Sequence, residues 1–263
     1  MNKSNHKDSN YSNFKAVFFD FGGTLMDAES DKVAHYYMMK DLKKFYQLPA
    51  TEEDLVNFYH EQLFNLDMTL KDTSHNGNFN NNQFRKLYFH SKSAFQLLLK
   101  EYNVKTSPSD FRLFHKIYYQ NHLKYIRLVE GVWDAISLVK NSGCHCGIIS
   151  DIDLDYQQKQ FQALGINDAF HSITTSEEVK HYKPDPVIFK AALQKAHCQG
   201  KEAIMIGDSY TKDIIGGKNM GMTTIWINNY QNHLDKNMAM AVDKADYRVS
   251  QFKEVIPILN KLL

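Results

Sequence analysis

Cysteine is scarce in this 263-residue chain, which contains only Cys144, Cys146 and Cys198. Three unevenly spaced thiols cannot form the disulfide framework that stabilises small secreted domains. This scarcity favours a reducing compartment, so we expect a cytoplasmic protein. The histidines include no His-x-x-x-His pair at helical spacing, and Cys144-His-Cys146 is typical of a buried strand. The sequence therefore gives no indication of a zinc site.

Long apolar runs and an excess of one charge are missing as well. No segment reaches the roughly 20 apolar residues that a membrane-spanning helix needs, so we expect no membrane partner. The polar stretch over residues 1–13 lacks the apolar core of a signal peptide, and we interpret it as a flexible tail. A formal net charge of +1 at pH 7 argues against nucleic acid as a partner. The oligomeric state is left open.

The segment Phe14–Leu25 combines an apolar run with an abrupt polar end. Six mostly apolar residues are followed by Asp20, and then by Gly22, Gly23 and Thr24. A nearly continuous apolar run is typical of a strand buried in a parallel sheet. Ligands bind beyond the carboxyl ends of such strands, and two glycines let the chain turn tightly near a ligand. We therefore expect Asp20 to face a ligand crevice.

Residues 29–127 show helical periodicity and no convincing strand. Apolar and aromatic side chains recur at helical spacing in four segments, and a polar loop over 75–83 separates the second from the third. The third segment begins near Phe84, and Ser107-Pro108 marks the start of the fourth. The sequence therefore predicts an α-helical cap, inserted directly after the first strand.

Strands and helices alternate from residue 128 onward. We expect strands near residues 145–150, 170–174, 203–207, 223–228 and 247–249, with helices over 132–139, 156–164, 187–197, 212–219 and from 253 onward. This alternation predicts βαβ units and a parallel sheet covered on both faces. The predicted fold class is α/β, a Rossmann-like doubly wound parallel sheet core over 14–28 and 128–263 with an inserted α-helical cap over 29–127.

Further polar residues fall at the ends of the predicted strands or in a loop before a helix. Ser150 and Asp151 close one strand, Asp208 and Asp213 follow another, and Lys183 precedes a helix. In a parallel sheet these strand ends share one edge with the first strand, and carboxylates gathered there need a cation. Oxygen ligands of this kind suit Mg²⁺. An added lysine, a hydroxyl and glycine-loop amides make the site suitable for a phosphoryl group.

Taken in order, these residues resemble the four motifs of the haloacid dehalogenase-like (HAD) hydrolase superfamily, most members of which are Mg²⁺-dependent phosphatases. The matching segments are Asp20–Leu25, Ser150, Lys183 and Gly207–Asp213. The resemblance extends from Phe14 to about Val249, and the helical block corresponds to the family's inserted cap. It implies hydrolysis of a small phosphorylated metabolite with Mg²⁺ as the cofactor.

The resemblance also implies a role for each matching residue. Asp20 would be the nucleophile that forms an aspartyl-phosphate, and Lys183 would offset the charge shared by nucleophile and phosphate. Mg²⁺ would be held by Asp20, the carbonyl of Gly22 and Asp208, with Asp213 supporting a bound water or orienting the lysine. The residues assigned to binding of substrate and phosphate are Gly22, Gly23, Thr24, Ser150, Asp151 and Lys183.

One position departs from the family pattern. Most HAD phosphatases have a second aspartate two residues after the nucleophile, where it acts as general acid and base, and this chain has Gly22 there. Positioned acid–base catalysis contributes roughly 10²- to 10⁴-fold to rate. Either Asp151, Asp153 or Asp155 replaces the missing acid, or the substrate has a good leaving group. In the third alternative, the chain is a phosphate-binding or regulatory protein with weakened catalysis.

Dehalogenases and the phosphonate-cleaving branch of the family also replace this aspartate. A dehalogenase needs no Mg²⁺, so the retained Asp208 and Asp213 argue against that activity. A phosphonatase needs a cap lysine that forms a Schiff base. The candidates Lys32, Lys40, Lys43 and Lys44 are typical of a solvated helix surface. Both activities are therefore less favoured than phosphatase activity.

Overall fold

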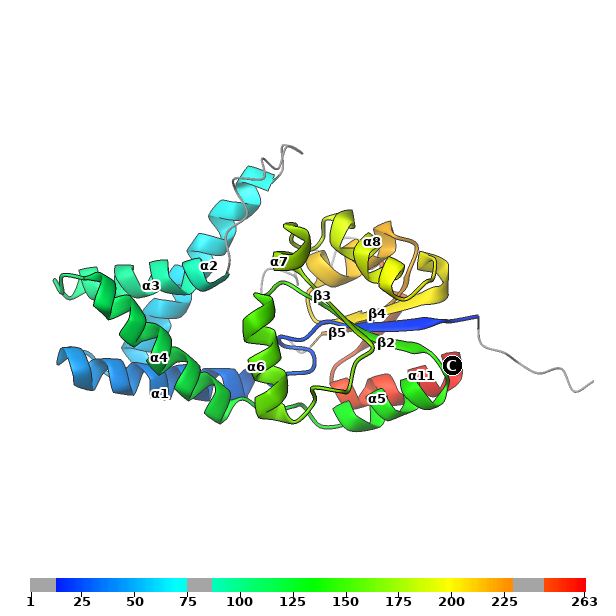
Figure 1. Cartoon of the computed structure of the whole chain (residues 1–263), viewed down its shortest axis with the longest axis horizontal. Coiled ribbons are helices and arrows are strands. Elements are labelled where there is room, and N and C mark those ends of the chain that lie inside the picture. The colour runs from blue at the N-terminus through cyan, green and yellow to red at the C-terminus, as the bar shows by residue number, and fades with distance from the viewer. Residues whose placement is uncertain (1–12, 75–86, 229–243) are drawn as a thin grey trace, which may run out of the picture.

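The computed structural model describes residues 13–74, 87–228 and 244–263, with the backbone only at 67–74 and 87–90. Within these residues the strands form one six-stranded parallel sheet in the order β3-β2-β1-β4-β5-β6 (Figure 1). The strands are β1 (Ala16–Phe19), β2 (His145–Ser150), β3 (Ser172–Thr175), β4 (Ala203–Gly207), β5 (Thr223–Ile227) and β6 (Tyr247–Val249). The predicted α/β class with a parallel sheet is confirmed. The predicted flexible tail, apart from residue 13, and the predicted loop over 75–83 lie outside the described residues.

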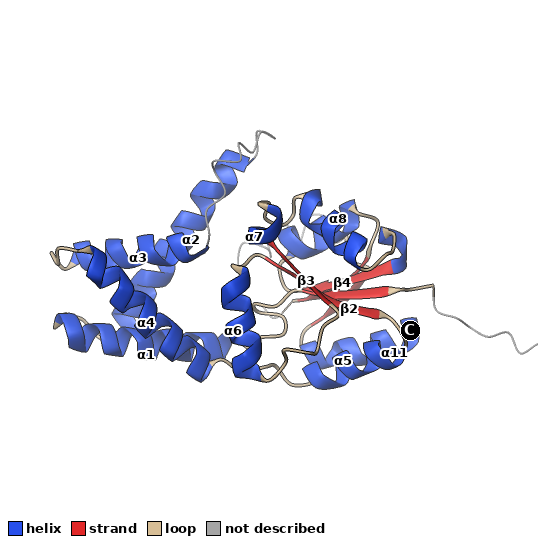
Figure 2. Cartoon of the chain, viewed as in Figure 1, coloured by secondary structure: helices blue, strands red, loops and turns tan. Residues whose placement is uncertain are grey.

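Helices cover both faces of the sheet, as Figure 2 shows. The α-helices are α1 (Ala28–Tyr46), α2 (Glu52–Ser74), α3 (Leu87–Glu101), α4 (Pro108–Tyr125), α5 (Val132–Asn141), α6 (Leu154–Leu164), α7 (Ser176–Val179), α8 (Pro186–Lys195), α9 (Gly216–Asn219) and α11 (Val255–Leu262). Helices α5 and α11 cover one face, and α7 and α8 lie on the other (Figure 1). Each face has its own buried apolar cluster. This is the doubly wound arrangement that the alternating pattern predicts.

The register of the sheet fixes the position of Asp20. In the last described pairs of β1, Phe19 lies beside Ile148 of β2 and Ile206 of β4. The next residue is Asp20, whose N–H donates to the Ile206 carbonyl at 2.9 Å. Because neighbouring strands run parallel, the chain segments that leave β2 and β4 emerge beside this aspartate.

Helices α1 to α4, which we call the helical insertion, pack around a separate apolar cluster. Its centre includes Met39, Tyr59, Phe95 and Phe114, and the rings of Phe95 and Phe114 stack with centroids 4.3 Å apart. Helix α4 begins with the predicted Ser107-Pro108 pair in a capping box. An independent core of this kind lets the insertion fold as a unit beside the sheet.

The two chain segments that join the helical insertion to the sheet run side by side. The Asp27 N–H donates to the Arg127 carbonyl at 2.9 Å, and the Val129 N–H donates to the Leu25 carbonyl at 3.0 Å. Ser30 Oγ donates to the Asp27 carbonyl at 2.7 Å and accepts from the Arg127 N–H at 2.9 Å. The insertion therefore leaves and re-enters the core at one place, a few residues beyond Asp20.

The segment after β4 differs from the helix predicted over 212–219. It is the π-helical turn η2 (Tyr210–Ile215) followed by the short helix α9. The N–H groups of Asp213 and Ile214 both approach the Ser209 carbonyl, at 2.9 and 3.4 Å. Such wide turns occur often at functional sites, and this one carries Asp213.

The remaining short elements are helix α7 and the 3₁₀ turns η1 (Gly200–Glu202) and η3 (Phe252–Glu254). They are too short to produce a periodic sequence pattern, which is why the sequence does not predict them. None of the helices among the described residues combines the length and apolarity that crossing a membrane requires.

Candidate active site

Three carboxylates converge at the carboxyl edge of the sheet. Oxygen atoms of Asp20, Asp208 and Asp213 all lie within 4.8 Å of one another. Asp20 comes from the end of β1, Asp208 from the end of β4, and Asp213 from η2. Asp20 and Asp213 are buried, at 7% and 0% exposure. The structure thus brings together the three acidic side chains that the sequence predicts to share a site.

Lys183 lies between two of these carboxylates. Its Nζ is 2.5 Å from Asp20 Oδ1 and 2.7 Å from Asp213 Oδ1, and it also donates to the Ile149 carbonyl at 3.1 Å. The lysine is 4% exposed. All three contacts hold the ammonium group against the predicted nucleophile.

Asp151 holds the loop that carries this lysine. Its Oδ1 accepts from the backbone N–H of Lys183 at 2.9 Å, and its Oδ2 lies 3.3 Å from Lys212 Nζ. Asp151 was expected to bind phosphate or to act as the substitute acid, and in the structure its carboxylate contacts the lysine loop. Ser150, which is also buried, ends β2 at the same edge of the sheet.

The loop after β1 approaches Asp208 closely. Thr24 Oγ1 donates to Asp208 Oδ1 at 3.0 Å. Gly23 has φ +78°, and a Cβ atom there would lie 2.6 Å from Asp208 Oδ2. Glycine is therefore required at position 23 for both its conformation and its lack of a side chain. Trp226 Nε1 donates to the Asp208 carbonyl at 3.0 Å and holds the other side of this residue.

The charges in the cluster do not balance. Burial raises the pKa of Asp213 to about 7, and Asp20 adds to that effect while Lys183 opposes it. Burial and the two neighbouring carboxylates also hold the pKa of Asp208 well above its usual range. Burial would lower the pKa of Lys183, but the carboxylates raise it above its usual value. One ammonium group thus faces three carboxyl groups, and a bound cation would balance the negative charge that the ammonium group does not.

The donor chemistry fits Mg²⁺. The cluster offers three carboxylates, with the Thr24 hydroxyl against one of them, and hard oxygen donors are what Mg²⁺ prefers. Asp20 and Asp208 are the side chains that would hold it, with Asp213 beside them.

Gly22 lies in open space. A Cβ atom added at this position would meet no other atom within 4 Å, and its φ is not in the left-handed region. The chain therefore has room for a larger residue where most of the family has an aspartate. Of the other acids considered, Asp153 occupies the N-cap position of α6, and Asp155 lies in the first turn of that helix.

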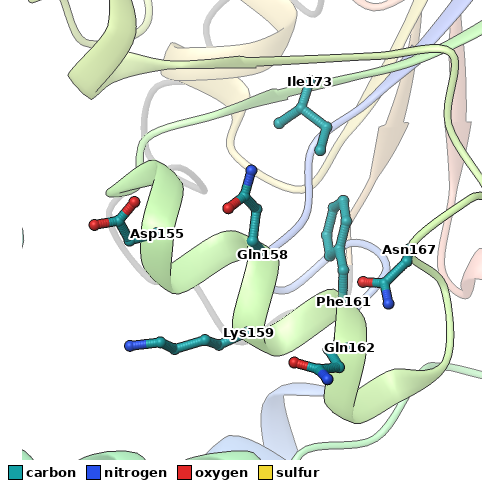
Figure 3. Close-up of a pocket in the computed structure, with 7 residues that line it drawn as sticks. All are labelled: Asp155, Gln158, Lys159, Phe161, Gln162, Asn167 and Ile173. Atoms are coloured by element: carbon teal, nitrogen blue, oxygen red, sulfur yellow. The ribbon is translucent and has the colours of Figure 1, made fainter.

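Asp155 also lines a pocket of about 540 Å³ along α6, together with Lys159, Phe161 and Ile173 (Figure 3). The pocket lining includes none of the three carboxylates of the candidate active site.

Two contacts at the site could not be read from the sequence. Lys212 and Trp226 both support it, through Asp151 and through the Asp208 carbonyl. Lys212 lies inside the segment Gly207–Asp213, at a position to which the motif assigns no residue type, and Trp226 is one apolar residue among others in β5. Neither position carries a local signal of its role.

Comparison with known proteins identifies one family and two full-length relatives that are named as phosphatases. The family model for haloacid dehalogenase-like hydrolases matches residues 17–227. The chain is 27% identical over 251 residues to glyceraldehyde 3-phosphate phosphatase of Methanothermobacter thermautotrophicus, covering 92% of this chain and 99% of that one. It is 25% identical over 246 residues to pyrophosphatase PpaX of Bacillus cereus, covering 94% and 96%.

The fold is shared with solved structures. The HAD hydrolase YfnB of Bacillus subtilis, whose crystal structure is bound to magnesium, superposes with a TM-score of 0.69 at 22% identity. The alignment covers 94% of this chain and 99% of that one. This similarity shows a common architecture for the sheet and the inserted helices.

Proposed function

Because the chain belongs to the haloacid dehalogenase-like hydrolases, we propose that it is a Mg²⁺-dependent phosphatase acting on a small phosphorylated metabolite through an aspartyl-phosphate at Asp20. The contact of Lys183 Nζ with Asp20 Oδ1, within a cluster of three carboxylates, is the observation that carries the proposal. Full-length similarity to two named phosphatases supports it.

In the proposed reaction, a carboxylate oxygen of Asp20 attacks phosphorus and the ester oxygen leaves with the bonding electron pair. Water then attacks the aspartyl-phosphate and releases inorganic phosphate. Lys183 holds one oxygen of Asp20 so that the other can point at phosphorus. The positive charge of the lysine offsets the negative charge of the phosphoryl group. Mg²⁺, when bound, would supply further charge neutralisation at the phosphoryl oxygens.

Asp213 and Asp151 orient the lysine in this proposal, one through its side chain and one through its backbone. Ser150 and the amides of Gly22 and Gly23 would bind phosphate oxygens, and Thr24 would hold the loop against Asp208. The helical insertion, assigned to residues 29–127, would act as a cap that excludes water from the site. The proposed location remains the cytoplasm, which rests on the scarcity of cysteine.

The open position at Gly22 sets the expected substrate class. Without a carboxylic acid there, the leaving oxygen must depart with little help from a proton donor. Acyl phosphates, aryl phosphates and phosphoanhydrides have good leaving groups and suit such a site. The same feature supports a second candidate function, a phosphate-binding or regulatory protein that turns over slowly.

The structure does not favour the two other family activities. The buried carboxylate cluster fits a cation, which a dehalogenase does not need. Of the lysines considered for a Schiff base, Lys32 pairs with Glu29 and Lys43 with Glu52 on the surface of the helical insertion. We therefore keep phosphatase activity as the proposal.

The test is phosphate release by the full-length protein, with and without Mg²⁺, from acetyl phosphate, an aryl phosphate, pyrophosphate and sugar phosphates. The control is Asp20→Asn, which keeps the size of the side chain and removes the nucleophile. We expect Mg²⁺-dependent release from the activated substrates and none from the variant. Equal release by Asp20→Asn would overturn the nucleophile assignment, and ligand binding without turnover would favour the second candidate.

A further inference from the structure

A second polar cluster lies inside the helical insertion, and it involves none of the carboxylates of the candidate active site. Asp31 and His35 come from α1, one helical turn apart, His60 comes from α2, and His122 from α4. His122 Nε2 is 2.6 Å from Asp31 Oδ1, and His35 Nδ1 is 3.6 Å from Asp31 Oδ2. His60 Nε2 is 2.9 Å from His35 Nδ1. Ligand-type atoms of Asp31, His35 and His122 thus all lie within 4.8 Å of one another, and His60 adjoins them through His35.

We propose that Asp31, His35, His60 and His122 bind a first-row transition-metal ion of the Zn²⁺ class. Three imidazole nitrogens and one carboxylate oxygen are typical of zinc, cobalt and nickel sites, whereas Mg²⁺ and Ca²⁺ prefer oxygen alone. Zinc bonds of about 2.0–2.1 Å in a tetrahedral site hold neighbouring donors roughly 3.3–3.4 Å apart. The measured separations of 2.6, 2.9 and 3.6 Å lie around that value.

The nitrogens on the other side of two rings bear on how tightly the ion is held. His35 Nε2 and His122 Nδ1 are buried and have no hydrogen-bond partner among the described residues. Among the described residues, no hydrogen bond to these outer nitrogens opposes the ring orientations in which His35 Nδ1 and His122 Nε2 face Asp31. Metal-binding histidines usually donate this outer N–H to an acceptor, so we expect a site that a chelator can empty. The Asp31 side chain is 30% exposed and gives the ion a route from solvent.

The location suggests what such an ion does. Asp31 lies four residues beyond Asp27 and His122 five residues before Arg127, so the cluster sits next to the paired connections between the helical insertion and the core. The ring of His122 also lies 5.5 Å from that of Tyr156 in α6. A bound ion would cross-link α1, α2 and α4 at this end and make the insertion more rigid.

The experiment is a Co²⁺ titration of tag-free, full-length protein that has been freed of metal with a chelator. We expect stoichiometric binding with visible d–d bands of the intensity typical of four- or five-coordinate Co²⁺, displaced by Zn²⁺ and unaffected by excess Mg²⁺. Elemental analysis of protein purified without chelator should find the same stoichiometry of zinc. Binding should also raise the melting temperature.

Two variants and two controls locate the ion. Asp31→Asn and His35→Gln should weaken Co²⁺ binding by at least about tenfold, a loss seen even when outer-shell partners of a metal site are changed. His115→Gln removes another histidine of α4 and should bind as the unchanged protein does. Asp208→Asn disturbs only the carboxylate site at the sheet, and its Co²⁺ spectrum should remain.

A hydrogen-bonded cluster without metal would give no stoichiometric Co²⁺ spectrum in the unchanged, folded protein, and that result would overturn the proposal. A spectrum that survives Asp31→Asn and His35→Gln but disappears in Asp208→Asn would overturn it as well. Circular dichroism of each variant confirms that a loss of binding is not a loss of fold. None of these readouts depends on phosphatase activity, so the two proposals fail separately.

Discussion

At the scale of single residues, the proposed preference for activated phosphates rests on Gly22. A side chain added there meets open space, and the backbone is not in the left-handed region. Gly22→Asp should therefore fold normally and raise turnover of a sugar phosphate by roughly 10²- to 10⁴-fold, the usual contribution of a positioned acid. Turnover of an aryl phosphate should change much less, because its leaving group needs little protonation.

Gly22→Asn is the matched control, since it has the same shape without an acidic proton. Values of kcat/KM for both substrates and all three proteins test the prediction. An equal gain with asparagine would show that filling the space matters and that the acid does not.

Asp213 should make the metal-free protein sensitive to pH. Its pKa is about 7 in the folded state against an ordinary value of 3.8, so the folded state binds more protons than the unfolded state between these values. Asp213 therefore contributes stability in EDTA that is greatest at the acidic end of this window and falls as pH rises toward about 7. His35, whose pKa burial lowers to about 4, contributes the opposite slope, so the measurement is the difference in thermal unfolding between the unchanged protein and Asp213→Asn across this range. A difference that grows in favour of the unchanged protein as pH rises would contradict the prediction.

Mg²⁺ should reverse this trend, because it binds the ionised carboxylates and its stabilising effect grows with pH. Asp213→Asn should remove the Asp213 contribution from the metal-free profile. The slope that remains in this variant combines Asp208, whose pKa is also raised, with His35 and His60, whose pKa values are lowered.

At the scale of elements, the loop after β1 can be tested with two glycines of nearly equal φ. Gly23 has φ +78° and Gly143 has φ +79°, but only a Cβ at Gly23 would meet Asp208. Alanine in this conformation costs about 1–2 kcal/mol, so both Gly23→Ala and Gly143→Ala should lose about that much free energy of unfolding. Only Gly23→Ala should also lose Mg²⁺ affinity and phosphate release, by more than about tenfold.

Denaturant titration gives the stability of each variant, and Mg²⁺-dependent phosphate release gives its function. Loss of activity in both variants would show that general destabilisation is responsible. Full activity in Gly23→Ala would show that the loop does not need its close approach to Asp208.

The elements also show how far sequence reasoning reaches in this chain. Apolar runs such as Ala16–Phe19 predict buried parallel strands, and the residues at their ends predict the acidic cluster. The π-helical turn at Tyr210–Ile215 cannot be predicted from the sequence, because its hydrogen-bond pattern does not alter the spacing of apolar residues. The contact of Asp151 with the backbone N–H of Lys183 is not predictable from the sequence, because it depends on where the distant loop of Lys183 lies in the fold.

The histidine cluster was missed for a similar reason. Only Asp31 and His35 lie close enough in sequence to suggest a shared helix face. His60 and His122 join them through the packing of three helices, which no spacing in the sequence reveals. A cluster assembled from three helices in this way need not contain a His-x-x-x-His pair on any one of them.

At the scale of the whole molecule, the chain joins the helical insertion to the core through one paired connection. Ser30 Oγ bridges its two sides, with bonds to the Asp27 carbonyl and the Arg127 N–H. Ser30→Ala should cost about 1–3 kcal/mol, since it removes two hydrogen bonds at a partly buried position. It should also change kcat and KM together, as mutations at hinges do.

Ser142→Ala is the matched control. Its Oγ donates to the Val139 carbonyl at 2.8 Å, at the end of α5 and away from the connection. Kinetics of both variants on an activated phosphate test the prediction. Equal kinetic effects in the two proteins would remove any special role for the connection.

The paired connection between Leu25 and Val129 also bears on how new specificities could arise in this architecture. Since both ends of the helical insertion meet at a single point, the stretch between them is a self-contained module. Its helices can be grafted, lengthened or replaced by those of another member without cutting through the sheet. In the proposed function, chemistry would belong to the sheet and recognition to the insertion, so evolution could exchange one while the other stays intact.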